Sequence, residues 1–164
     1  MKVKIKKLNK GAIIPRYAKD QDAGLDLVAT SKSYDDNGNV VYGTDLAFEI
    51  PKGYVGLLFP RSSNAKKDLL LSNSVGVLDS GYRGEVLFKF KSSIRSLSLM
   101  SLVKIIFKKN GNKLKIFNEF SGDYKIGDRI GQLIIMPYPT IEFEEVEELS
   151  ETERGSRGYG STGK

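Results

Sequence analysis

The sequence predicts an all-β fold, a distorted jelly roll or β-barrel with one short helix and a flexible C-terminal tail. Many short apolar segments alternate with polar residues as half-buried strands do, and turn residues separate them at near-regular spacing. Only one segment, which begins at Ser62, has the start signal of a helix. The last residues lack any core-forming periodicity. Such a chain is expected to close its sheets on one another rather than alternate strands with helices.

The length of 164 residues suits one domain, expected over residues 1–141, followed by an acidic linker and a flexible motif over 142–164. Seven acidic and three basic residues give this last segment a net charge of −4 in a chain of +6. The remaining positive charge could attract polyanions, and a solvated lysine surface explains it equally well. The N-terminus has no hydrophobic signal core, which favours an intracellular, cytoplasmic protein from a cellular, phage or viral source.

Strands and turns follow one another along the first half of the chain. Strands are expected around 3–8, 25–29, 48–50 and 54–59, with turns at 35–39 and 51–53. The run Ser62-Ser63-Asn64 can cap a short helix through Leu71.

The segment 73–90 predicts a β-hairpin with an acid at its bend. Two runs of alternating apolar residues flank Asp79-Ser80-Gly81-Tyr82. The glycines around this bend suit a close approach of a ligand to the main chain. Asp-Ser-Gly is also a common turn in which the aspartate caps its own backbone, so a plain turn explains the pattern equally well.

Beyond this hairpin, residues 92–101 fit a helical turn or a loop, and the pattern does not decide between them. Asn110-Gly111 predicts a second hairpin that pairs Phe107 with Leu114 and Ile105 with Ile116, and that opposes Lys108 to Lys113. A strand is expected at 129–135, and Pro137 and Pro139 end the globular pattern.

The composition leaves few residue types for catalysis. The chain has no cysteine and no histidine, which excludes a thiol nucleophile, an imidazole base and the usual zinc sites. A catalytic base must therefore be an aspartate or a glutamate. Such a carboxylate is ionised at neutral pH and can accept a proton from water.

Five short motifs follow one another along the chain. They are DAGLDL at 22–27, PRSS at 60–63, GVLDSGYRGE at 76–85, GDRIGQL at 127–133 and RGSRGYGSTG at 154–163. In this order they resemble the signature motifs of the trimeric dUTPase family. Each motif alone is a weak signal, whereas five in the family's order span most of the chain. The resemblance implies the family's dUTPase-like β-fold and the hydrolysis of dUTP to dUMP and pyrophosphate.

The resemblance implies a role for each matching residue. Asp79 is implied to be the general base that activates a water for attack on the α-phosphate, while Arg61, Ser62, Ser63 and Gln132 contact the phosphates. The alternative for Arg61 is a structural ion pair with Asp26. The implied substrate-binding residues are Arg61, Ser62, Ser63, Asn73, Val77, Leu78, Tyr82, Leu87, Gln132, Arg154, Tyr159 and Gly160.

Uracil recognition is implied to come from the main chain between Val77 and Asp79, with Asn73 as a side-chain partner. A fixed backbone would reject cytosine by leaving buried polar groups unpaired. Tyr82 is implied to lie under the deoxyribose and exclude a 2′-hydroxyl. Tyr159, where the family usually has phenylalanine, is implied to stack over the uracil and keeps the aromatic face.

The resemblance further implies a Mg²⁺ ion and a homotrimer with sites shared between subunits. Mg²⁺ is expected on the triphosphate oxygens and water, with Asp26 near it through water and acting mainly as a brace. No membrane or nucleic-acid partner is expected. The chain departs from the family between the third and fourth motifs, where residues 91–123 read as an insertion that leaves the site intact or binds a partner through its strand edges.

Two alternative functions stay open at the level of the sequence. A dCTP deaminase-like enzyme shares the broad fold, but such relatives have a catalytic glutamate where this chain has Lys89. A non-catalytic basic β-barrel that binds nucleic acid or a regulatory protein would explain the lysine excess. The aromatic residues, however, are not interleaved with basic ones as a single-strand binding surface requires.

Overall fold

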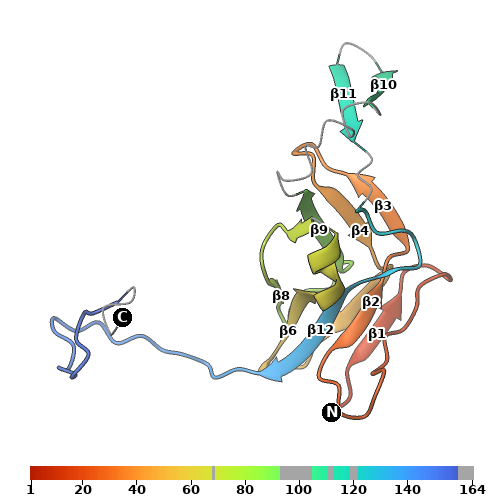
Figure 1. The fold of residues 1–164 in the computed structure, drawn as a ribbon. Helices are drawn as coiled ribbons and strands as arrows, with labels where there is room; N and C mark the ends of the chain where they lie inside the picture. The colour runs from red at the N-terminus through yellow and green to blue at the C-terminus, as the bar shows by residue number, and fades with distance from the viewer. Residues whose placement is uncertain (68, 93–104, 111–112, 119–121, 159–164) are drawn as a thin grey trace.

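A computed structural model of the chain describes residues 1–67, 69–92, 105–110, 113–118 and 122–158. The fold is all-β apart from one 3₁₀ helix, η1 (Ser62–Lys66), which confirms the predicted fold class (Figure 1). The strands are β1 (Lys4–Lys7), β2 (Leu25–Val28), β3 (Ser31–Tyr34), β4 (Val40–Gly43), β5 (Leu46–Glu49), β6 (Tyr54–Pro60), β7 (Leu69–Leu71), β8 (Gly76–Leu78), β9 (Leu87–Ser92), β10 (Ile105–Asn110), β11 (Lys113–Asn118) and β12 (Arg129–Pro137).

Two four-stranded antiparallel sheets form the body, in the orders β2-β12-β6-β8 and β3-β4-β9-β7, and β1 pairs with β5. The core lies between them and is filled by alternate side chains. In β9, for example, Phe88 and Phe90 are fully buried while Lys89 between them faces outward. Their rings pack with those of Tyr42 and Tyr124. The sequence shows the same alternation of apolar and polar residues.

The predicted helix is shorter than expected, because its second half is a strand. The chain forms a 3₁₀ helix over Ser62–Lys66 and then β7, which pairs with β9. Leu69 and Leu71 are buried, whereas Leu70 is 61% exposed, which is the period of a strand. The predicted cap is wrong as well, since Ser62, Ser63 and Asn64 lie inside the helix, and the residue at its start, Arg61, makes no side-chain cap bond.

The predicted hairpin around Asp79 is wrong, because the two strands beside the acid do not pair with each other. β8 pairs with β6, and β9 pairs with β4 and β7 in the other sheet. The segment between them is a crossover that begins with a tight turn, closed by the bond from Tyr82 N to Asp79 O (3.0 Å). Buried Leu78 and Val86 anchor its two ends in the core. Asp79 therefore lies where the chain leaves one sheet for the other.

The second predicted hairpin exists, with a different register. β10 and β11 form a two-stranded sheet that stands away from the body (Figure 1). Phe107 pairs with Ile116 instead of Leu114, Ile105 with Asn118 instead of Ile116, and Lys108 with Lys115 instead of Lys113. The shift is two residues, so it keeps the side of the sheet on which each residue was expected. The undecided stretch 92–101 lies outside the described residues from position 93 onward.

The chain leaves the body after β12, as Pro137 and Pro139 predicted. The bond from Tyr138 N to Gly53 O (3.0 Å) is its last backbone contact with the body, and residues 138–158 are exposed. Figure 1 shows this segment extending away from the sheets. Among the described residues, no helix is both long and apolar enough to span a bilayer.

Candidate active site

A pocket of about 220 Å³ opens beside the edge strand β8. Six predicted site residues line it together with three others, of which Gly76 is one of the glycines expected to let a ligand approach, while the other two were not singled out in the sequence. The predicted ones are Asn73, Val77, Leu78, Asp79, Tyr82 and Leu87, and the others are Leu58, Gly76 and Glu85. The structure thus brings the residues that were expected around the base and the sugar together in one pocket.

The alternation of β8 divides its residues between core and pocket. Leu78 points into the core, while Val77 on the opposite face is 61% exposed. In the described part of the fold, β8 has a paired neighbour only in β6, so the N–H and C=O groups on its other edge remain available to a ligand. Gly76 keeps this strand close to β6, since a Cβ there would stand 3.0 Å from the Cβ of Leu58.

Tyr82 is held across the pocket by the turn that contains it. Its hydroxyl donates to the carbonyl of Glu85 (3.1 Å), and a Cβ at Gly84 would stand 2.3 Å from that hydroxyl. The guanidinium of Arg83 donates to the carbonyls of Ser80 (2.7 Å) and Tyr82 (2.8 Å). Glycine at position 84 is therefore needed for the ring to lie where it does.

Two carboxylates line the pocket, and their surroundings differ. Glu85 Oε1 accepts a hydrogen bond from the backbone N–H of Asp45 (2.9 Å), which has a φ of 52°, so Glu85 stabilises a strained turn. It also packs against Gly43, where a Cβ would stand 2.6 Å from Oε1. Asp79 is exposed, and within the described residues its side chain makes no hydrogen bond or ion pair. It can therefore accept a bond from a water molecule.

A second polar cluster surrounds Asp26 on β2. Its Oδ1 accepts bonds from Arg61 Nε (2.8 Å) and Gln132 Nε2 (3.2 Å), and its Oδ2 accepts from Arg129 (2.9 Å). Arg61 also donates to the hydroxyl of Ser63 (3.3 Å). The register of β2 on β12 places Gln132 opposite Asp26. The ion pair that the sequence offered as an alternative for Arg61 is therefore present.

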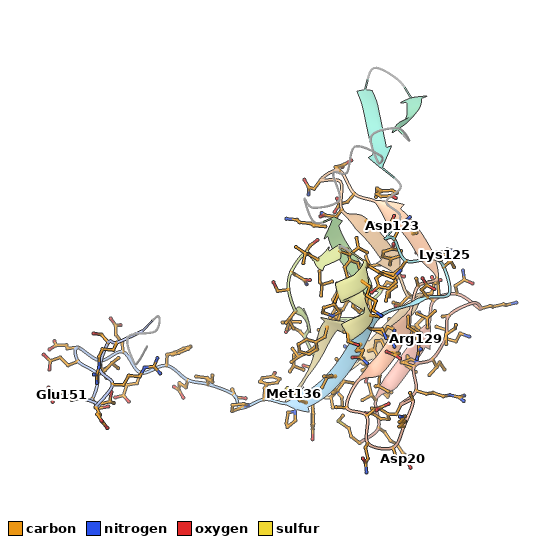
Figure 2. All side chains as sticks on the ribbon, in the orientation of Figure 1. Asp20, Asp123, Lys125, Arg129, Met136 and Glu151 are labelled. Carbon is orange, nitrogen blue, oxygen red and sulfur yellow. The ribbon has the colours of Figure 1, made fainter. Side chains whose placement is uncertain are left out.

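The sequence did not single out Arg129, the fifth member of this cluster. It lies at the start of β12, where Figure 2 labels it, and its side chain is 53% exposed. One carboxylate between two guanidinium groups leaves the cluster with a net charge of +1. Such a cluster can bind a further anion. Arg129 is part of the GDRIGQL motif, four residues before its end, so the sequence contained it. Only the fold shows that Arg129 and Arg61 both donate to Asp26.

The two clusters lie at opposite ends of β6. Leu78, which precedes Asp79, pairs with Gly56. Arg61 lies five residues beyond Gly56, so the two are roughly 16 Å apart at the rise of a strand. Because β8 runs antiparallel to β6, Asp79 lies on the other side of Gly56, still further from Arg61. One chain by itself therefore does not bring Asp79 and Arg61 to the same phosphate.

The C-terminal motif lies apart from both clusters. Arg154 and Arg157 exchange side-chain bonds to each other's carbonyls (3.0 Å each), and both are exposed. Tyr159 and Gly160, expected over the base, lie outside the described residues. The remaining predicted phosphate contact, Ser62, is the first residue of η1.

These features are those of an all-β hydrolase of nucleotide metabolism. The family model that matches the chain is that of dUTPase, over residues 10–105 and 91–163. The chain belongs to the dUTPase family and is a dUTP diphosphatase.

Individual relatives agree with this family. The deoxyuridine 5′-triphosphate nucleotidohydrolase of Nautilia profundicola is 39% identical over 166 residues, with 100% of each chain covered. That of Corynebacterium glutamicum is 37% identical, covering 99% of this chain and 95% of its own. A dUTPase of Staphylococcus bacteriophage 80alpha, solved with dUPNHPP, superposes with a TM-score of 0.76 at 32% identity, over 99% of this chain and 98% of that one. Each is similar over at least 95% of its own length.

Two findings bear on the metal and on the deaminase alternative. The family uses a divalent metal, and the described residues contain no group of three carboxylates that could hold an ion by themselves. Both oxygens of Asp26 are already engaged by Arg61, Arg129 and Gln132, so its surroundings suit a brace better than a direct ligand. The position where dCTP deaminases have a catalytic glutamate is occupied by Lys89. Its side chain forms a surface ion pair with Asp35 (3.4 Å).

Proposed function

We propose that the chain hydrolyses dUTP to dUMP and pyrophosphate at the pocket beside β8, with Asp79 as the general base. Asp79 takes a proton from a water molecule as the water oxygen attacks the α-phosphorus. The bond from that phosphorus to the bridging oxygen of the β-phosphate breaks, and pyrophosphate leaves. The observation that carries this proposal is the carboxylate of Asp79 on the lining of the pocket, which has no partner among the described residues.

The base and the sugar fit the pocket by shape and by its main-chain groups. The free edge of β8 between Val77 and Asp79 offers donors and acceptors for uracil, and Asn73 adds an amide. Because the side chain of Leu78 is buried in the core, its contribution to the ligand is that of its backbone. Leu87 supplies apolar surface, and we assign the exclusion of a 2′-hydroxyl to the ring of Tyr82, whose hydroxyl is bonded to the carbonyl of Glu85.

The triphosphate is held by the cluster around Asp26. Arg61, Ser62, Ser63 and Gln132 supply donors and positive charge, and Arg154 reaches the terminal phosphate from the tail, with Tyr159 stacked on the uracil and Gly160 beside it. We assign Mg²⁺ to the triphosphate oxygens and water, where it neutralises phosphate charge. Asp26 orients Arg61 and Gln132 and approaches the ion only through water.

The spacing of the two clusters supports a homotrimer whose sites are shared between subunits. The roughly 16 Å between Gly56 and Arg61 along β6 is too long for one chain to supply both the base and the phosphate contacts. The exposed tail from Tyr138 onward is free to reach a neighbour. We place this enzyme in the cytoplasm, with neither membrane nor nucleic acid as a partner.

Shared sites predict that two inactive variants complement each other. Asp79→Asn and Arg61→Ala should each form trimers with little activity. Mixed trimers refolded from both chains should recover part of the wild-type rate, because some sites receive Asp79 from an Arg61→Ala chain and Arg61 from an Asp79→Asn chain. Dissociated and refolded single variants serve as controls. A monomeric mass near 18.2 kDa by light scattering, or no recovery in mixed trimers, would contradict shared sites.

Substrate selectivity tests the proposed reaction directly. Pyrophosphate release should occur with dUTP and fall at least a hundredfold with dCTP and UTP, because a site built on hydrogen bonds rejects analogues that leave its groups unpaired. Chelation of divalent metal with EDTA should lower the rate, and added Mg²⁺ should restore it. Ammonia release from dCTP would instead favour the deaminase, and no turnover of any nucleotide would reject the proposal.

A further inference from the structure

The inserted segment 91–123 ends against the element that carries the arginine–serine pair. At Gly122 the chain packs on the end of η1 so closely that a Cβ would stand 2.3 Å from the carbonyl oxygen of Lys67. The ammonium of Lys67 donates to the carbonyl of Asp123 (3.3 Å) and lies 4.4 Å above the ring of Tyr124. Figure 2 shows Asp123 where the chain returns from the β10–β11 hairpin to the body.

The hydroxyl of Tyr124 bonds to the residues that follow Arg61. It donates to Asn64 Oδ1 (3.1 Å), and the amide of Asn64 in turn donates to the carbonyl of Leu69 (2.5 Å). Burial raises the pKa of Tyr124. The backbone N–H of Asn64 donates to the carbonyl of Arg61 (2.9 Å). Ser63 accepts the bond from Arg61. Bonds through Asn64 therefore join the hydroxyl of Tyr124 to the backbone of Arg61 and to the residue next to Ser63.

Tyr124 is held firmly from its other side. Its backbone carbonyl accepts a bond from the buried hydroxyl of Tyr42 (3.1 Å), and its ring packs edge-on against that of Tyr42. The preceding carboxylate, Asp123, accepts bonds from Lys32 (2.6 Å) and Tyr34 (3.3 Å) on β3. Burial lowers the pKa of Lys32, but the bond to Asp123 and its charge outweigh burial, so this pKa is raised. The ion pair is thus a stable anchor on the sheet.

The helix η1 needs support of this kind. It has only five residues, its start has no side-chain cap, and none of its residues is buried. The hydrogen-bond geometry of a 3₁₀ helix is poorer than that of an α-helix, so such a short one depends on tertiary contacts for its position. Tyr124 lies outside all five motifs and supplies a buried contact to η1 from outside the helix.

We propose that Tyr124 is a positioning residue, which holds Ser63 and Arg61 in the orientation that the triphosphate requires. The last residues of the inserted segment, Gly122 and Asp123, together with Tyr124 that follows them, accordingly hold the phosphate-binding residues in position. The proposal rests on the proposed function, because it assumes that Ser63 and Arg61 bind phosphate. Its effect should appear in binding of the triphosphate and leave the nucleoside pocket beside β8 unaffected.

The variant Tyr124→Phe tests this, since it keeps the ring and the contact with Lys67 and removes only the hydroxyl. The KM for dUTP should rise about fivefold, the effect of losing one neutral hydrogen bond. The inhibition constant of deoxyuridine, which has no phosphate, should stay unchanged. Thr30→Val is the matched control, because it removes a part-buried hydroxyl bond, to the carbonyl of Gly43 (3.2 Å), that involves neither Tyr124 nor η1. Its thermal midpoint should fall similarly while its KM stays at the wild-type value.

Each other outcome has a definite meaning. An unchanged KM in Tyr124→Phe, with an active wild type, overturns the positioning role. Equal weakening of dUTP and deoxyuridine also overturns it, because the loss would then be general rather than confined to the phosphates. An equal rise in KM in Thr30→Val overturns it in the same way. A wild type that does not hydrolyse dUTP rejects the proposed function instead, which separates the two failures.

Discussion

Asp79→Asn should reduce kcat for dUTP about 10³-fold, because an amide cannot accept the proton that the attacking water must lose. The substitution keeps the size and shape of the side chain, and Asp79 makes no hydrogen bond within the described residues that its loss would break. The fold and the binding of a non-hydrolysable dUTP analogue should therefore persist. Pyrophosphate release measures the rate, and calorimetry with the imido analogue measures binding.

Glu85→Gln is the matched control, since Glu85 is the other carboxylate that lines the pocket. Its Oε1 accepts a bond from the N–H of Asp45, and the amide oxygen of glutamine can accept the same bond. The variant should keep kcat within about tenfold of the wild-type value, far above the rate of Asp79→Asn. If Glu85→Gln loses activity and Asp79→Asn keeps it, the base is Glu85 and the assignment from the motif is wrong.

The strands were predictable from the sequence because each keeps one face in the core. Phe88 and Phe90 alternate with lysines, and this period survives into the structure. The partner of each strand was not predictable in the same way. Two strands joined by a tight turn at Asp79 suggest a hairpin, yet β8 pairs with β6 and β9 with β4, since each strand can bury its apolar face only in its own sheet.

The site was predictable as a set of residues but not as a geometry. The resemblance to the family implied that Asn73, Tyr82 and Asp79 bind one nucleotide, and all three line one pocket. Glu85 and Arg129 were missed because their partners, the amide of Asp45 and the carboxylate of Asp26, are distant in the sequence. A local sequence pattern does not predict contacts between residues so far apart in the chain.

A glycine in the fourth motif has a packing role that its sequence context alone does not show. A Cβ at Gly131 would stand 2.1 Å from the ring of Phe88, far inside contact distance. Phe88 is fully buried and cannot turn away without displacing the core. Gly131 lies between β2 and β6 beside a register irregularity in β12, so the strand has partners on both sides. The same residue precedes Gln132 of the cluster around Asp26.

Gly131→Ala should accordingly lower the free energy of unfolding by roughly 3 kcal/mol, the upper range for overpacking a core. Denaturant unfolding measures it. Gly11→Ala is the control, because a Cβ there meets nothing within 4 Å, and it should change stability by less than about 0.5 kcal/mol. The cost of Gly131→Ala should shrink in a Phe88→Leu background, since a smaller side chain relieves the overlap. Equal stability of the two alanine variants would mean that the ring of Phe88 relaxes freely, and the packing argument would fail.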